Sequence, residues 1–275
     1  MCKDPAFYGV ISVPGSVFTT IPNDLHRRRR ALLSPFFSGK AVLAKEDLVH
    51  EKVDQLRRRI QADIDASVPT DLYLAFRAIS LDVITQLAFN DCWGFLSQPD
   101  YGSFFEEMVR KTIGARLFTL QMFPFLEKPS KSIPMWLSRR LSPMFAGFVD
   151  IQERTGNTVK EVKRRMEGGV VGEERTVFHV LLDAAGEEGT GDGRRGVKVS
   201  VRDVADEAVI ICGAASDTVG KALMVSAVNV LSDRGLYERV KGELRGRYPD
   251  PTERMRFREL ERLEVLTAVV KEGLR

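Results

Sequence analysis

Apolar residues recur at three- and four-residue spacing along most of the 275-residue chain, whereas the alternation typical of β-strands is rare. This pattern predicts a mainly α protein. We expect Asn23 or Asp24 to cap the first helix, and Ser200 and Asp203 to cap the longest one. The predicted helices cover about 25–33, 40–66, 71–88, 104–113, 146–166, 176–184, 200–231, 235–247 and 263–275.

Composition indicates a globular protein. Hydrophobic residues make up 44% of the chain and charged residues 29%, which supports a packed core and argues against extensive disorder. No signal peptide opens the sequence, and the most apolar stretch, Ala208 to Ala215, is too short to span a bilayer. We therefore expect a soluble, cytoplasmic chain without a membrane anchor.

Charge, cysteines and histidines argue against several classes of function. The 41 basic and 38 acidic residues give a net charge of +3, which is too even to indicate a nucleic-acid binder. The three cysteines lack Cys-x-x-Cys spacing and the three histidines lie far apart, so no metal site is expected. Gly191, Gly193 and Gly196 fit a dinucleotide-binding pattern, but no strand precedes them, so a solvated loop is favoured.

A basic segment, His26-Arg-Arg-Arg-Arg30, lies within the first predicted helix. Residues 26 and 30 are one helical turn apart and share a face. A guanidinium there is suited to pair with a carboxylate or a phosphate. Taken alone, the segment is more simply a solvated basic face or a nucleic-acid patch.

A second segment, Ala214-Ala-Ser-Asp-Thr218, lies in the middle of the longest predicted helix. The preceding residues, Ala208 to Gly213, are uncharged, so we expect this region to be buried. An acid beside a hydroxyl is costly there unless it is paired or used, which makes Asp217 and Thr218 a candidate proton-handling pair. A hydrogen-bonded kink of the helix is the alternative.

The chain ends in Glu272-Gly-Leu-Arg275. Glu272 and Arg275 are three residues apart and can meet on one helix face. As an isolated pair they would form an ordinary surface salt bridge of little energetic value.

Together, these three segments resemble the cytochrome P450 family in order and spacing, in particular its fungal members. Residues 26–38 resemble the C-helix region (helix about 24–34), Ala214 to Thr218 resembles the oxygen-activation motif of the I-helix (about 200–231), and residues 261–275 resemble the K-helix (about 263–275) with its Glu-x-x-Arg. The resemblance runs through nearly all of the chain. It implies a single partial cytochrome P450 domain over 1–275, truncated at both ends and lacking the C-terminal haem-cysteine region.

The resemblance implies haem (heme, iron protoporphyrin) as the cofactor. Arg30 matches a residue that pairs with a haem propionate, and His26 stands where many members have a tryptophan with the same role. Ala214 and Ala215 match residues beside the haem and the oxygen site, where Ala215 replaces a usual glycine.

Two further pairs receive roles from the resemblance. Asp217 and Thr218 match the acid and the alcohol that relay protons during oxygen activation. Glu272 and Arg275 match a buried ion pair that organises the haem-side core.

The implied activity is that of an oxidoreductase, a monooxygenase of secondary metabolism that inserts one oxygen atom from dioxygen into a hydrophobic small molecule. Its electrons come from NADPH through a partner reductase, and full-length relatives lie at the endoplasmic reticulum membrane. The family's Phe-x-x-Gly-x-Arg-x-Cys-x-Gly loop, which carries the axial cysteine ligand, is missing here, and Cys212 is interpreted as a buried core residue. The chain alone is therefore expected to be inactive and to bind haem weakly at best. A non-catalytic truncated remnant and a helical binding protein for an apolar ligand remain the alternatives.

Overall fold

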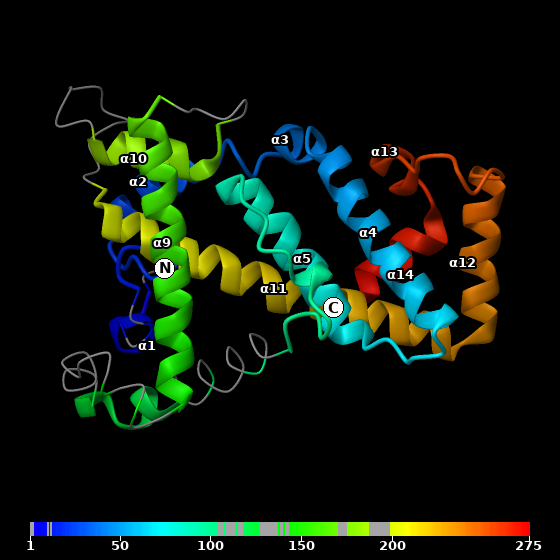
Figure 1. Cartoon of the computed structure of the whole chain (residues 1–275), viewed down its shortest axis with the longest axis horizontal. Helices are drawn as coiled ribbons and strands as arrows, with labels where there is room; N and C mark the ends of the chain where they lie inside the picture. The colour runs from blue at the N-terminus through cyan, green and yellow to red at the C-terminus, as the bar shows by residue number, and fades with distance from the viewer. Residues whose placement is uncertain are drawn as a thin grey trace. The chain divides into compact units, whose positions relative to one another are not determined.

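The computed structural model describes residues 3–9, 11, 13–103, 107, 114, 118–126, 137, 140, 143–169, 175–186 and 199–275. Within these ranges every regular element is a helix, which confirms the predicted mainly α class (Figure 1). The helices are α1 (Pro5–Gly9), α2 (Asn23–Leu33), α3 (Gly39–Leu43), α4 (Glu46–Asp65), α5 (Leu72–Phe89), η1 (Phe95–Ser97), η2 (Pro124–Leu126), α9 (Pro143–Glu167), α10 (Val177–Gly186), α11 (Val201–Ser232), α12 (Arg234–Arg247), α13 (Phe257–Leu260) and α14 (Glu264–Gly273).

Most predicted helices are found within a few residues of their expected ends, but two details of the prediction were wrong. Pro22, whose ring sets a suitable backbone angle, holds the capping position of α2, so Asn23 and Asp24 lie inside the first turn instead of capping it. The long helix expected over 40–66 is divided into α3 and α4, because Lys45 leaves the helical conformation at φ −102° and ψ 11°.

Some predictions fall on other parts of the chain. The helix predicted over 104–113 falls largely on residues outside those that the structure describes, as does the glycine-rich loop with Gly191, Gly193 and Gly196.

The contacts divide the chain into two compact units. Unit 1 consists of Met1–Ser38, Ile84–Trp93 and Gly102–Ala214, and unit 2 consists of Gly39–Val83, Gly94–Tyr101 and Ala215–Arg275. Two of the boundaries fall within α5 and α11, so each of these helices contributes residues to both units. That the chain forms a single domain stays a prediction.

The core of unit 1 is built on aromatic stacking. The ring of Phe89 stacks on Phe178, with centroids 4.5 Å apart, and on Trp93, with centroids 6.1 Å apart. The guanidinium of Arg154 lies 4.2 Å from the centroid of the Trp93 ring. α10, which carries Phe178, packs against α9 and α2 (Figure 1). Burying each such side chain stabilises the unit by roughly 1.5–3 kcal/mol.

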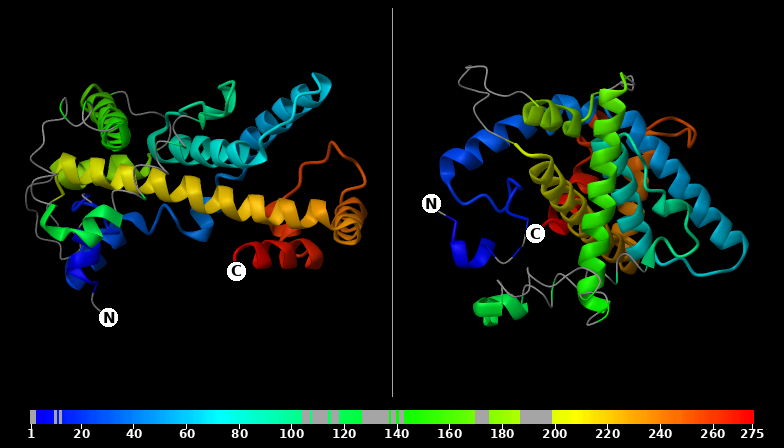
Figure 2. Two further views of the ribbon diagram at one scale, coloured as in Figure 1. Left: turned by 90° about the horizontal axis from the view of Figure 1, so that it is seen from below. Right: turned by 60° about the vertical axis from the view of Figure 1, so that its left-hand side comes forward.

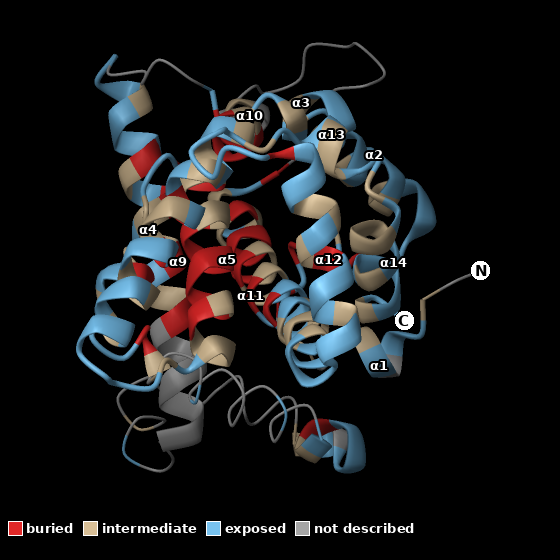
Figure 3. Cartoon of the chain, turned by 90° about the vertical axis from the view of Figure 1, so that its right-hand side faces the viewer, coloured by how far each residue is buried: buried red, intermediate tan, exposed pale blue. Residues whose placement is uncertain are grey.

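The core of unit 2 includes a buried carboxylate. Asp82 is fully buried and accepts hydrogen bonds from the backbone N–H groups of Phe95 at 2.8 Å and Leu96 at 2.9 Å. These are donors at the start of η1 that would otherwise lack a helical partner. Residues 77–82 of α5 are buried without interruption, so the helix is enclosed on all sides there (Figure 3).

α11 begins as predicted. Ser200 donates its backbone N–H to the Asp203 carboxylate at 2.7 Å, and Asp203 donates its own N–H to Ser200 Oγ at 3.1 Å, a reciprocal cap. From there the helix continues without a break (yellow to orange in Figure 2).

By length and composition alone, α5 and α11 are both able to cross a membrane. The sequence analysis considered only the eight residues from Ala208 to Ala215 and did not consider the full length of these two helices. A core helix of a globular domain passes the same test. Half of the apolar window of α5 and a third of that of α11 are buried within the protein.

Candidate functional site

α2 places His26 and Arg30 on one face, and both line a pocket of about 520 Å³ in unit 1. Burial lowers the pKa of His26, as do the charges of Lys3 and Arg30, so the imidazole is uncharged at neutral pH. The pocket is also lined by Lys3, Tyr8, Val17, Phe18, Leu33, Ser34, Phe37 and Glu207.

Two buried acids of α11 hold the loop that forms one wall of this pocket. Glu207 accepts a hydrogen bond from the backbone N–H of Val17 at 2.6 Å, and Asp206 accepts one from the N–H of Gly15 at 2.9 Å. Burial raises the pKa of both carboxyl groups, and these hydrogen bonds oppose the rise. The sequence analysis missed both residues, although two adjacent acids at the start of an apolar helix are the signal that would have identified them.

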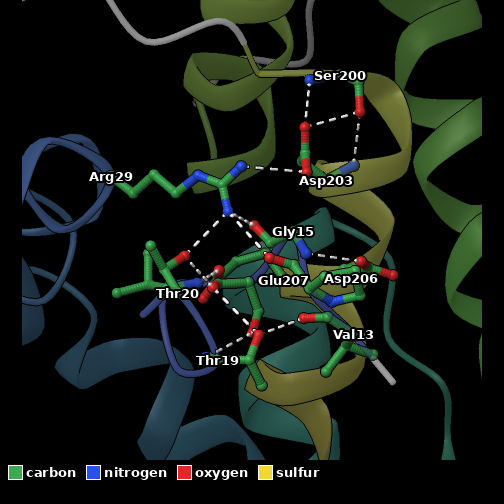
Figure 4. A network of polar contacts seen from close by, with 12 residues as sticks. Val13, Gly15, Thr19, Thr20, Arg29, Ser200, Asp203, Asp206 and Glu207 are labelled. Carbon is green, nitrogen blue, oxygen red and sulfur yellow. Dashed lines mark hydrogen bonds and ion pairs between the residues drawn. The ribbon is translucent and has the colours of Figure 1, made fainter. Parts of the chain in front are cut away.

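The guanidinium of the neighbouring Arg29 binds other residues of the chain and does not line the pocket (Figure 4). Its Nη1 donates to the carbonyl of Gly15 at 2.7 Å and to Thr20 Oγ1 at 3.0 Å, and its Nη2 pairs with Asp203 at 3.2 Å. Arg29 therefore fixes the loop to α2 and α11. Arg30, one residue later, is turned to the pocket instead.

The side chains of Asp217 and Thr218 in α11 are more exposed to solvent than predicted. Ala208 and Cys212 are buried as expected, but Ala214 and Thr218 are exposed, and the Asp217 side chain is 59% exposed. The prediction of burial was wrong for these positions because a run of uncharged residues shows that a helix is apolar but not which of its faces other segments cover.

Asp217 is paired with a buried arginine that the sequence analysis missed. Arg77 of α5, whose side chain is only 4% exposed, donates through Nη1 to Asp217 Oδ1 and to Tyr73 Oη, the latter at 2.9 Å. Ser80, also on α5, donates to the backbone carbonyl of Ala215 at 2.7 Å. An arginine and a serine three residues apart in a largely apolar helix were the available signal.

Thr218 lines an apolar groove of about 650 Å³ in unit 2. Ser226 is the other hydroxyl residue of its lining, and the remaining side chains are hydrocarbon. The lining residues are Leu72 and Phe76 of α5, Thr218, Val219, Ala222, Leu223, Ser226, Ala227, Val230 and Leu231 of α11, Leu266, Val269 and Val270 of α14, and Leu274.

The terminal pair forms, but it is not buried. Arg275 Nη1 lies 3.2 Å and 3.4 Å from the two carboxylate oxygens of Glu272. The Arg275 and Glu272 side chains are 80% and 68% exposed, respectively, and the buried role implied by the family resemblance stays a prediction. At this end of α14, Gly273 lies against Ser226 of α11, whereas the Glu272 and Arg275 side chains are left exposed.

Cys212 is buried in α11, and burial raises the pKa of its thiol to about 12. Such a thiol stays protonated at neutral pH and is a poor metal ligand. Among the described residues, no group of three or more histidine, cysteine and acidic side chains is arranged to hold a metal ion.

The candidate residues thus form separate groups. His26 and Arg30 share a pocket in unit 1, whereas Asp217, Thr218, Glu272 and Arg275 belong to unit 2. Ala214 and Ala215 lie on either side of the boundary in α11.

Comparison with known proteins gives a consistent result. The cytochrome P450 family model matches residues 4–275. The chain is 27% identical over 274 residues to the cytochrome P450 monooxygenase macH of Penicillium terrestre, covering 99% of this chain and 52% of that protein. It is 29% identical to the tryptophan 6-hydroxylase fscE of Fusarium equiseti, covering 94% and 49%, and 28% identical to the fusicoccadiene C-8 hydroxylase of Phomopsis amygdali, covering 99% and 56%.

The fold is also that of a known structure. A crystal structure of a cytochrome P450, CYP102L1, superposes with a TM-score of 0.73 at 15% identity and covers all of this chain and 56% of its own. The chain spans about half the length of the curated relatives it matches.

Proposed function

Because the chain belongs to the cytochrome P450 family, we propose that it is part of a haem-dependent monooxygenase that inserts one oxygen atom from dioxygen into a hydrophobic small molecule. The observation that carries this proposal is the pocket that His26 and Arg30 line together. Several relatives over nearly the whole chain are monooxygenases or hydroxylases by name, which supports the same reaction class.

The lining of the His26–Arg30 pocket fits the family's cofactor. Haem carries two propionates on an apolar ring, and the pocket combines cationic and neutral donors with aromatic and aliphatic walls. The acid in its lining, Glu207, already accepts a hydrogen bond from the backbone N–H of Val17. Lys3 already donates to the carbonyl oxygens of Val17 at 3.0 Å and Phe18 at 2.7 Å. Arg30 and the neutral imidazole of His26 are therefore the groups that would hold a propionate.

The chain's own contribution to the chemistry would be proton handling. Bound haem supplies the iron at which dioxygen is activated, with electrons that we propose come from NADPH through a partner reductase. The exposed Asp217 carboxylate can take a proton from solvent at Oδ2, and the neighbouring Thr218 hydroxyl can pass it on. Two protons and two electrons are needed for each dioxygen, so that one oxygen atom enters the substrate and the other leaves as water.

We expect the 275-residue chain alone not to turn over substrate. The family's chemistry would need a cysteine thiolate to hold the haem iron, and the high pKa and deep burial of Cys212 oppose that role. For the whole protein we propose a substrate from secondary metabolism and a location at the endoplasmic reticulum membrane.

Hemin titration of the 275-residue chain, followed by absorbance, tests the role of Arg30. The Arg30→Ala variant should bind hemin about tenfold more weakly, the loss of about 1.4 kcal/mol expected for one charge-assisted contact. Arg27→Ala is the matched control, because Arg27 is exposed and does not line the pocket. Equal affinities of the Arg30 variant and the wild type would rule out this site for the propionate.

Reduction under carbon monoxide tests the expectation of inactivity. The wild-type chain loaded with hemin should give no thiolate-type Soret band. The appearance of that band would contradict the expectation and would show that a cysteine of this chain binds the iron.

A second candidate function, binding of an apolar ligand without catalysis, is favoured by the groove along α11 and α14. The hydrophobic dye Nile red should bind to the chain, and Ala222→Trp should weaken that binding by filling the groove. Ala268→Trp is the control, because Ala268 is exposed on α14 and does not line the groove. Unchanged dye binding in the Ala222 variant would refute ligand binding in this groove.

A further inference from the structure

Three contacts in unit 2 join α5 to the segment of α11 that carries the acid and the alcohol. Arg77 donates to the Asp217 carboxylate, and Ser80 Oγ donates to the carbonyl oxygen of Ala215 at 2.7 Å. The third contact is steric: a Cβ added at Gly220 would lie 2.6 Å from Arg77 Cγ and 3.3 Å from its Cα. α11 therefore contacts α5 on either side of Asp217 in the sequence, at Ala215 two residues before it and at Gly220 three residues after it.

The glycine allows this arrangement. A Cβ atom essentially never lies within 3.0 Å of a heavy atom of a distant residue, so any larger residue at 220 would displace the stem of Arg77. The close approach lets the buried guanidinium reach across to the exposed carboxylate. The carbonyl oxygen of Ala215 can accept from Ser80 as well as from its own helix, because it has two lone pairs.

The burial of the Arg77 guanidinium explains why it pairs with the Asp217 carboxylate. Arg77 is almost fully buried, and a desolvated guanidinium is costly unless an anion pairs with it. Asp217 supplies that anion, and Tyr73 accepts a further hydrogen bond from the same Nη1 atom. The carboxylate is consequently drawn toward α5, whereas Thr218, the next residue, lines the apolar groove.

We propose that Arg77 is a positioning residue for the reaction, because it holds the Asp217 carboxylate on the α5 side of α11. In this position Arg77 controls the rate at which protons pass from Asp217 to Thr218. Ser80 and Gly220 fix the relative position of α5 and α11 at which Arg77 can reach the Asp217 carboxylate. The inference deepens the proposed monooxygenase function and rests on it.

The contact itself is tested on the 275-residue chain without haem. Carbodiimide and glycine ethyl ester label accessible carboxyl groups, and mass spectrometry measures the rate at each residue. Asp217 should be labelled about threefold faster in Arg77→Met than in the wild type, because the carboxylate is no longer paired. Arg77→Lys should restore slow labelling, and Arg58→Met, at an exposed arginine of α4, should change nothing.

The role is tested in the haem-loaded, full-length protein with its reductase. When the rate of proton delivery is no longer controlled, dioxygen takes up two electrons and two protons and leaves as hydrogen peroxide instead of giving product and water. Arg77→Met should raise the share of NADPH electrons recovered as peroxide by about threefold. Haem content and the substrate-induced spectral shift should stay at wild-type values, which a merely structural role would not predict. Gly220→Ala should reproduce the effect by displacing Arg77, and Arg77→Lys should largely reverse it.

The outcomes separate this inference from the proposed function. A normal thiolate-type spectrum with an unchanged or lower peroxide share in both Arg77→Met and Gly220→Ala would overturn the positioning role and leave the function intact. A wild-type protein without that spectrum would overturn the function, and with it the role of Arg77. Equal labelling of Asp217 in the wild type and in Arg77→Met would overturn the contact in either case.

Discussion

The Gly15→Ala substitution should destabilise unit 1 by about 3 kcal/mol, because the loop that Gly15 belongs to lies directly against the first turn of α11. An added Cβ would lie 2.4 Å from Asp203 Oδ1 and 2.5 Å from Asp203 Cα. The second of these atoms belongs to the backbone, so rotation of a side chain cannot relieve the clash. Overpacking of this kind costs about 2 kcal/mol. The hydrogen bond from the Gly15 N–H to Asp206, now 2.9 Å long, is worth about 1 kcal/mol more.

A second glycine of unit 1 provides a control with the opposite sign. Gly156 lies within α9, and no atom lies within 4 Å of a Cβ added there. Gly156→Ala should therefore stabilise the chain by about 1 kcal/mol, since alanine has the higher helix propensity and reduces the entropy of the unfolded chain.

Urea denaturation at pH 7, followed by far-UV circular dichroism, gives the unfolding free energy of each variant. We expect the two alanine variants to differ by about 4 kcal/mol. If Gly15→Ala unfolds within about 0.5 kcal/mol of the wild type while Gly156→Ala gains stability, the packing of the loop against α11 is wrong.

Three other predictions concern single side chains. Asp82→Ala should cost about 3 kcal/mol in urea unfolding because two backbone N–H groups lose a buried charged acceptor, whereas the exposed Asp91→Ala should cost little; equal losses would refute the buried role. Burial raises the pKa of Glu207 in the folded state above its unfolded value, so its ionisation costs stability, and that cost is lost as the pH falls from 7 through the folded pKa. Glu207→Gln should therefore gain more stability relative to the wild type at pH 7 than at pH 5, and a difference independent of pH would contradict the raised pKa. Cys212 should react with iodoacetamide only after denaturant is added, as measured by mass spectrometry, and rapid labelling in the native chain would show that it is not buried.

Much of the helical structure was determined by the sequence alone. The spacing of apolar residues predicted α5, α9 and α11, and the Ser200–Asp203 cap was identified from residue types at a spacing of three. The pairing of His26 and Arg30 on one face was also predicted, because residues four apart in any α-helix share a side. These are relations within one turn of a helix, where backbone geometry fixes the outcome.

The tertiary structure decided what those local rules leave open. Arg77 and Asp217 lie 140 residues apart in the sequence, and only the packing of α5 beside α11 brings them together. The same holds for Glu207, whose acceptor role depends on the path of a loop 190 residues earlier. The exposure of Asp217 was mistaken for burial because sequence alone gives the face of a helix but not what covers it. Side-chain spacing is set by the 3.6-residue turn, whereas burial and long-range pairing depend on how distant segments pack, which no local pattern encodes.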